Sequence, residues 1–209
     1  MPVRERQTLR AAVAAHPNQE QKMQRRDFGL GGGALLLATA AGVSQAQEAA
    51  MTDVITDDVV VTRLFDAPIE RVWRAFTTDA DVTRWWGPDG FTAPHVRMDA
   101  REGGASVVCM RSPEGHDIWM RWDYAVVNAP HRLEYVQNIS DAEGNHVDPV
   151  SIGMPPDFPS DVATVVALRA VGDQTELVMT EHTTTSAQMM EMSRLGLEQC
   201  MDKMGKIFS

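Results

Sequence analysis

The fold of this chain is decided by residues 63–104, RLFDAPIERVWRAFTTDADVTRWWGPDGFTAPHVRMDAREGG. The segment begins as a strand and continues as an amphipathic helix with Pro68 in its first turn. A second short helix ends at the paired tryptophans Trp85 and Trp86, before a Gly-Pro turn. Another strand and a Gly-Gly hairpin follow. This order predicts a curved antiparallel sheet with helices packed against it.

The remaining sequence continues as strands and turns and closes on a long helix. Asp66 is placed to cap the first helix. The segment 140–160 carries four prolines and no hydrophobic period, so we predict a long loop that could act as a lid. The predicted strands are 54–65, 95–99, 105–111, 117–127, 132–139, 161–170 and 175–183, and the predicted last helix is 187–208.

A set of short motifs resembles the signature of the START-like (SRPBCC) superfamily. The set comprises Asp66-Ala67-Pro68, Val72-Trp73, Trp85-Trp86-Gly87-Pro88, Asp99 and Gly103-Gly104. Within that superfamily it is most similar to the AHSA-type branch, which is named after the C-terminal domain of the activator of the heat-shock-protein-90 ATPase. With the last helix included, the resemblance covers about residues 54–208.

The resemblance implies an α+β helix-grip fold. A curved antiparallel sheet would wrap around the long C-terminal helix, with two short helices after the first strand and an apolar cavity between sheet and helix. The domain would occupy residues 54–209, after a linker at 47–53. Members of the superfamily bind, carry or transform different apolar molecules, so the resemblance defines the fold more closely than the function.

The N-terminus has the features of a twin-arginine signal peptide. Arg25 and Arg26 are followed by Phe28, an apolar run and the small-x-small cleavage pattern Ser44-Gln45-Ala46. The apolar run is shorter than the roughly 20 residues that span a bilayer. We therefore predict that residues 1–46 are removed, that the twin-arginine translocase is a partner during export, and that the mature protein is periplasmic or secreted.

Charge and cysteine content narrow the possible partners. Residues 1–46 hold six Lys/Arg and three Asp/Glu, so with an overall net charge of −10 the remainder carries −13. A domain this acidic repels phosphate backbones and anionic membrane surfaces, so we expect no nucleic acid and no stable membrane anchor. The only cysteines, Cys109 and Cys200, lie on elements expected to face each other. We nevertheless favour two buried free thiols over a disulfide.

Aromatic and sulfur-containing side chains are the candidate lining of the cavity. Trp119 and Trp122 are three residues apart on one strand, so they must face opposite sides of the sheet. On the last helix, Met189, Leu197 and Met204 fall on one arc. The alternative is that such side chains only fill the core. The candidate ligand-binding residues are Trp85, Trp86, Met110, Trp119, Tyr135, Met189, Leu197 and Met204.

The sequence carries no strong catalytic motif and no histidine spacing typical of a metal site, so we expect no metal and no cofactor. The weak catalytic candidates are His182, the adjacent Glu181, and His95. Because neighbours on a strand face opposite ways, one of Glu181 and His182 should point inward. The charged strand residues expected on the solvated outer face are Arg97, Arg121 and Glu134.

Three functions remain open. The leading hypothesis is an exported carrier domain that holds a small apolar or amphipathic molecule between the sheet and the last helix. The resemblance also allows an enzyme of the cyclase, dehydratase or hydrolase kind, acting on an aromatic or polyketide-like substrate. The third is a stress-related interaction or co-chaperone-like domain, although the chaperone machine of that family needs ATP, which the periplasm does not supply.

Overall fold

The computed structural model describes residues 54–209. The predicted signal peptide at residues 1–46, with Arg25, Arg26 and Phe28, lies outside the described residues, as does the predicted linker at 47–53. Export of the chain therefore stays a prediction from the sequence.

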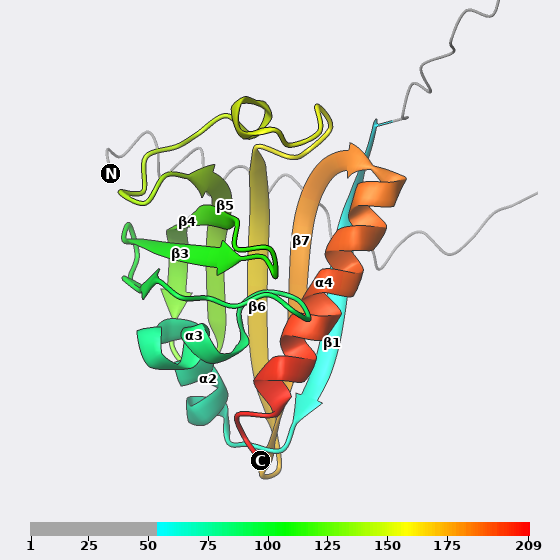
Figure 1. Ribbon diagram of the computed structural model, residues 1–209. Coiled ribbons are helices and arrows are strands. Elements are labelled where there is room, and N and C mark those ends of the chain that lie inside the picture. The colour runs from blue at the N-terminus through cyan, green and yellow to red at the C-terminus, as the bar shows by residue number, and fades with distance from the viewer. Residues whose placement is uncertain (1–53) are drawn as a thin grey trace, which may run out of the picture. The chain divides into compact units, whose positions relative to one another are not determined.

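Within residues 54–209 the sheet has seven strands, and every neighbouring pair is antiparallel. Their order is β1-β7-β6-β5-β4-β3-β2, so the first strand pairs with the last and the others follow as successive neighbours (Figure 1). The strands are β1 (Val54–Phe65), β2 (Val96–Arg97), β3 (Ala105–Arg111), β4 (Asp117–Asn128), β5 (Arg132–Ser140), β6 (Asp161–Val171) and β7 (Gln174–Ser186).

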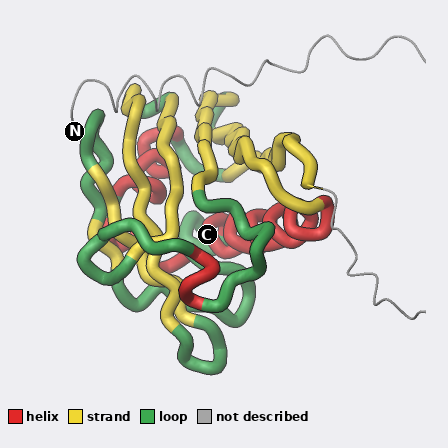
Figure 2. The backbone as a smooth tube through the Cα atoms, turned by 90° about the horizontal axis from the view of Figure 1, so that it is seen from above, coloured by secondary structure: helices red, strands yellow, loops and turns green. Residues whose placement is uncertain are grey.

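Within residues 54–209 the α-helices are α2 (Ile69–Thr77), α3 (Asp79–Trp85) and α4 (Ala187–Gly205), and η1 (Pro149–Ile152) is a short 3-10 helix. The α-helices lie on one side of this sheet (Figure 1), and the strands curve around α4 when the molecule is seen from above (Figure 2). Pro68, rather than the predicted Asp66, occupies the cap position of α2. The arrangement is the predicted α+β helix-grip fold.

The two faces of the sheet are distinct. We call the side covered by the helices the inner face and the opposite side the outer face. Strand alternation sends every second side chain inward. The register places Val61 opposite Met179, Met179 opposite Val166, and Val166 opposite Leu133. Each of the four is at most 2% exposed. Four neighbouring strands therefore share one continuous apolar inner face.

The C-terminal helix α4 buries one arc of its surface against this face. The buried residues recur at helical spacing and are Leu197, Cys200, Met201 and Met204. Ser186 begins the helix, because its Oγ accepts a hydrogen bond from the Met189 amide at 3.2 Å. The helix ends at Gly205, earlier than the predicted Phe208, because the last amides bond to carbonyls three residues back. The Phe208 ring then packs against Phe65 at 5.2 Å.

The predicted strand at 95–99 is shorter in the structure, where β2 has two residues. The Met98 amide donates to Asp79 Oδ1 at 2.8 Å, and the Asp99 amide donates to Ser106 Oγ at 2.9 Å. Because side chains take up these amides, the backbone there does not pair with a strand.

The two cysteines lie on opposite sides of the sheet. Cys200 faces inward from α4, whereas Cys109 lies opposite Trp119 on the outer face. Both are buried free thiols, as predicted. Alternation along β3 turns Val108 toward the helices and Cys109 away from them, so the two thiols do not meet.

Two glycine-to-alanine changes are expected to have opposite effects on stability. A Cβ at Gly104 would stand 2.4 Å from the backbone oxygen of Asp99, so Gly104→Ala should lower the free energy of unfolding by about 1–3 kcal/mol. A Cβ at Gly196, inside α4, would meet nothing within 4 Å, so Gly196→Ala should raise it by about 0.5–1 kcal/mol. Urea denaturation measures both, and equal stabilities would contradict the packing around Gly104.

Candidate functional site

A run of aromatic rings crosses the interior from the short helices to the sheet. Phe76 of α2 and Trp85 of α3 have ring centroids 5.2 Å apart, and Trp85 meets Trp86 at 5.5 Å. Trp86 meets Trp122 of β4 edge to face at 4.8 Å, and Trp122 stacks on Tyr135 of β5 at 5.2 Å. None of the five is more than 5% exposed. The run fixes α3 against the inner face.

The buried indole N–H groups of this run differ in their hydrogen bonds. Trp85 Nε1 donates to the Ala75 carbonyl at 2.7 Å, and Trp122 Nε1 donates to Gln137 Oε1 at 2.9 Å. Trp86 Nε1 is buried and has no acceptor among the described residues. Trp86 therefore contributes a desolvated donor that residues 54–209 leave unpaired.

Two buried polar side chains, Glu181 and Thr183, lie on the inner face of β7. Glu181 is 5% exposed, and its Oε2 accepts a hydrogen bond from Ser193 Oγ of α4 at 2.6 Å. Burial raises the pKa of the Glu181 carboxyl, so the site favours the neutral acid. Thr183 follows on the same face, and its Oγ1 is buried without a partner among the described residues.

The thiol of Cys200 lies between Glu181 and the turn that follows Trp86. The backbone of Gly87 hydrogen-bonds to the thiol, and burial together with the nearby Glu181 raises the Cys200 pKa to about 12. Burial also raises the pKa of the Tyr135 hydroxyl, and negative charge on the nearby Glu181 or Cys200 would raise that pKa further. Glu181, Ser193, Tyr135 and Cys200 therefore lie near one another between α4 and the inner face. We call these four residues, together with Trp86 and Thr183, the inner-face site.

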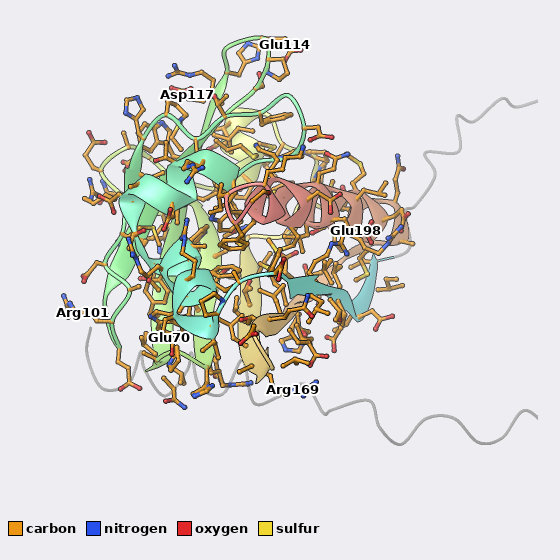
Figure 3. All side chains as sticks on the ribbon, turned by 90° about the horizontal axis from the view of Figure 1, so that it is seen from below. Glu70, Arg101, Glu114, Asp117, Arg169 and Glu198 are labelled. Carbon is orange, nitrogen blue, oxygen red and sulfur yellow. The ribbon has the colours of Figure 1, made fainter. Side chains whose placement is uncertain are left out.

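Charged groups are kept at the border of this site. Lys203 of α4 donates from Nζ to the carbonyl oxygens of Gly87 at 2.7 Å and Phe91 at 3.0 Å. These bonds hold the loop after α3 against α4. Arg101, Glu114 and Arg169 project from the periphery of the molecule (Figure 3). The buried carboxyl group of Glu181, by contrast, takes part in none of the ion pairs within residues 54–209.

Most predicted ligand-binding residues lie on the inner side of the sheet. Trp85, Trp86, Tyr135, Leu197 and Met204 belong to the buried core, and Met110 packs against it half-buried. Trp119 does not, because it faces outward and stacks on His95 at 5.5 Å. Its expected place in the lining was wrong. Met189 is half-buried and is not part of the core, whereas Met201 is fully buried and Met190 packs against the core half-buried.

The catalytic candidates separate in the same way. Alternation along β7 turns Glu181 inward and His182 outward, where Nδ1 of His182 bonds to Asp58 Oδ1 at 2.6 Å. His95 lies on the outer face with Trp119. The prediction that one residue of the adjacent pair points inward is confirmed, and that residue is Glu181. His182 and His95 both lie on the outer face, away from the surroundings of Glu181.

Two residues of the inner-face site, Thr183 and Ser193, were not predicted from the sequence. Thr183 is two positions after Glu181, so strand alternation could have placed it on the same face. Ser193 lies four positions before Leu197, on the arc of α4 that faces the sheet. The sequence pattern does not indicate a functional role for either residue, because a single hydroxyl group suggests no particular chemistry until its hydrogen-bond partner is known.

A hollow lies on the outer face, where the segment after β5 folds back. Its volume is about 300 Å³, and its lining comprises Asn138, His146, Val147, Asp148, Pro149, Ser160 and Asp161. Beside it Asp123, 3% exposed, accepts from Arg121 Nη2 at 2.8 Å and lies 3.5 Å from His146 Nε2. Arg121 and Glu134 thus lie on the outer face as predicted, but each takes part in an ion pair. No cluster arranged for a metal ion occurs within residues 54–209.

Comparison with known proteins identifies relatives of the same fold. A protein of Chromobacterium violaceum is 24% identical, with a TM-score of 0.60 over 72% of this chain and 96% of its own. A protein of Arthrobacter aurescens is 21% identical, with a TM-score of 0.61 over 75% and 90%. The AHSA1 protein of Silicibacter pomeroyi is 16% identical, with a TM-score of 0.58 over 72% and 96%.

No curated protein matches the chain. None of the helices in the described part of the chain has the length and apolar character that crossing a membrane requires. The model of one family, described as Activator of Hsp90 ATPase homolog 1-like protein, matches residues 66–209. The chain therefore belongs to this AHSA1-like family, on a helix-grip fold of the SRPBCC type.

Proposed function

We propose that this chain is an exported protein that binds a small apolar or amphipathic molecule between the inner face of its sheet and α4. The observation that carries the proposal is the pair of buried, unpaired polar atoms, Trp86 Nε1 and Thr183 Oγ1, in an interior that is otherwise aromatic and aliphatic. An unpaired buried polar group costs about 1–3 kcal/mol, and native proteins keep few of them. A ligand with a polar end would satisfy these groups.

The surroundings of these atoms suit such a ligand. The aromatic run from Trp85 to Tyr135 supplies flat apolar surface, and the sulfur atoms of Met201 and Met204 adapt to irregular shapes. Apolar walls with a few polar anchors are typical of small-molecule sites. Export follows from the sequence alone, through Arg25, Arg26 and Phe28, and the twin-arginine translocase would be the partner in transit.

A second function, catalysis on an aromatic or polyketide-like substrate, is favoured by one observation. Glu181 is a buried carboxyl group with a raised pKa, next to the Tyr135 hydroxyl, and a neutral acid of this kind can donate a proton to a bound substrate. Turnover that depends on Glu181 and changes with pH would distinguish the enzyme from the carrier.

Native mass spectrometry with organic extraction tests the leading proposal. Protein recovered from the periplasm should begin near Gln47 and carry a reproducible extra mass that extraction releases. Trp86→Phe and Thr183→Val should reduce that occupancy, whereas Thr180→Val, a matched change on the outer face of β7, should not. A bare polypeptide mass, together with no uptake of N-phenyl-1-naphthylamine, would contradict ligand binding. A mass that retains Met1 would contradict removal of residues 1–46, and absence of the protein from the periplasm would contradict export.

A further inference from the structure

We propose that the inner-face site selects uncharged ligands that carry a hydrogen-bonding oxygen, such as phenols and aryl ketones, and rejects carboxylates, with Glu181 as a neutral donor. The inference rests on the proposed function, since it names the class of ligand that the same site would take. It is carried by the hydrogen bonds of Glu181 and by the groups that face it.

The hydrogen bonds of Glu181 leave one of its oxygens for a ligand. Ser193 Oγ donates to Oε2 at 2.6 Å, and no described residue bonds to Oε1. No ion pair within residues 54–209 includes Glu181. A carboxylate buried without a cation is costly, so the neutral acid is the form that the site accommodates. Its O–H on Oε1 would then donate to an acceptor oxygen.

In the described part of the chain, the elements packed around Glu181 bring no positive charge to it. Val59 of β1 and Thr164 of β6 lie opposite it in register. The Tyr135 hydroxyl of β5 and the Cys200 thiol of α4 also lie near Glu181. Burial raises the pKa of both groups. Both groups are therefore uncharged at neutral pH. The ammonium of Lys203, also on α4, bonds to two loop carbonyls.

This environment discriminates between ligands by charge. A carboxylate would lose its hydration and gain no cation, so its binding would carry the full cost of desolvation. A phenol or ketone loses far less hydration. The phenol oxygen can accept from Glu181 or from Trp86 Nε1, and its O–H can donate to Thr183 Oγ1, so a ligand of this kind would pair polar atoms that the described residues leave unpaired.

Isothermal titration calorimetry at pH 7 with four naphthalene probes tests the inference. The probes are naphthalene, 2-naphthol, 2-naphthoate and naphthalen-2-ylmethylamine, and N-phenyl-1-naphthylamine fluorescence reports independently whether the site binds any apolar molecule. We expect 2-naphthol to bind at least about tenfold more tightly than 2-naphthoate, which is the effect of one unpaired buried polar group.

Variants of Glu181 separate its role from packing. Glu181→Gln keeps a neutral donor and should retain 2-naphthol binding within about threefold, whereas Glu181→Leu should weaken 2-naphthol about tenfold and leave naphthalene unchanged. Glu176→Gln is the matched control, since Glu176 lies on the same strand and pairs with Arg169 on the outer face.

The outcomes distinguish a failure of this inference from a failure of the proposed function on which it rests. Equal or tighter binding of 2-naphthoate would overturn the inference while the proposed function stands. Tightest binding of the amine would also overturn it, because Glu181 would then be an anionic anchor. If neither 2-naphthol nor N-phenyl-1-naphthylamine binds, the proposed function fails, and the inference fails with it.

Discussion

Replacing Trp85 with alanine is expected to lower the free energy of unfolding by about 3–5 kcal/mol, the usual cost of removing a fully buried tryptophan. Trp85 has no exposed surface, and its rings pack between Phe76 and Trp86. The change also leaves the Ala75 carbonyl without the indole N–H that it accepts at 2.7 Å. Urea denaturation followed by circular dichroism measures the loss.

Trp119→Ala is the matched control for this prediction. Trp119 is half-buried on the outer face, where its main aromatic neighbour is His95, so its removal should cost clearly less than that of Trp85. Equal losses for the two variants would show that the outer face contributes as much to the core as the inner face. That result would contradict the assignment of the core to the inner face.

Glu181→Gln is expected to become progressively more stable than the unchanged protein as the pH rises. Burial raises the pKa of Glu181 in the folded protein above the ordinary value of 4.5. The folded state therefore binds a proton that the unfolded state releases, so the stability due to this group is complete below about pH 4.5 and falls as the pH rises toward the folded pKa. The slope is about 1.4 kcal/mol per pH unit in that window.

Unfolding by urea at a series of pH values from 4 to 8 measures this difference. Glutamine cannot ionise, so the variant lacks the decline that Glu181 causes, and the two stability curves should diverge above pH 4.5. Glu176→Gln, on the outer face of the same strand, should run parallel to the unchanged protein. A constant offset between Glu181→Gln and the unchanged protein would show that Glu181 ionises normally in the folded state.

The sequence predicted the architecture well because the signals that define it are local. Hydrophobic alternation placed β1 and β3 with their correct bounds, and the Trp85-Trp86 pair marked the end of α3. Side-chain hydrogen bonds to the backbone are not visible in such patterns. The amides of Met98 and Asp99 bond to side chains, and for that reason the predicted strand at 95–99 was too long.

The candidate site was predicted only in part, because it depends on register and on contacts between distant elements. Alternation required Glu181 and His182 to face opposite ways, but only the pairing of β7 with β1 and β6 decides which of them points inward. Ser193 gains its role through a hydrogen bond to a strand twelve residues earlier. Nothing local to Trp86 reveals that its N–H lacks an acceptor.

The central claim is that a small molecule occupies the inner-face site, and the indole N–H signals of the protein test it most directly. The chain has five tryptophans, so a ¹⁵N–¹H spectrum resolves five such signals, which single Trp→Phe variants assign. On titration with 2-naphthol, the Trp86 signal should shift most and the Trp85 signal, already bonded to Ala75, should stay in place. A Trp86 signal that does not move while the Trp119 signal on the outer face does would contradict ligand binding at the inner-face site.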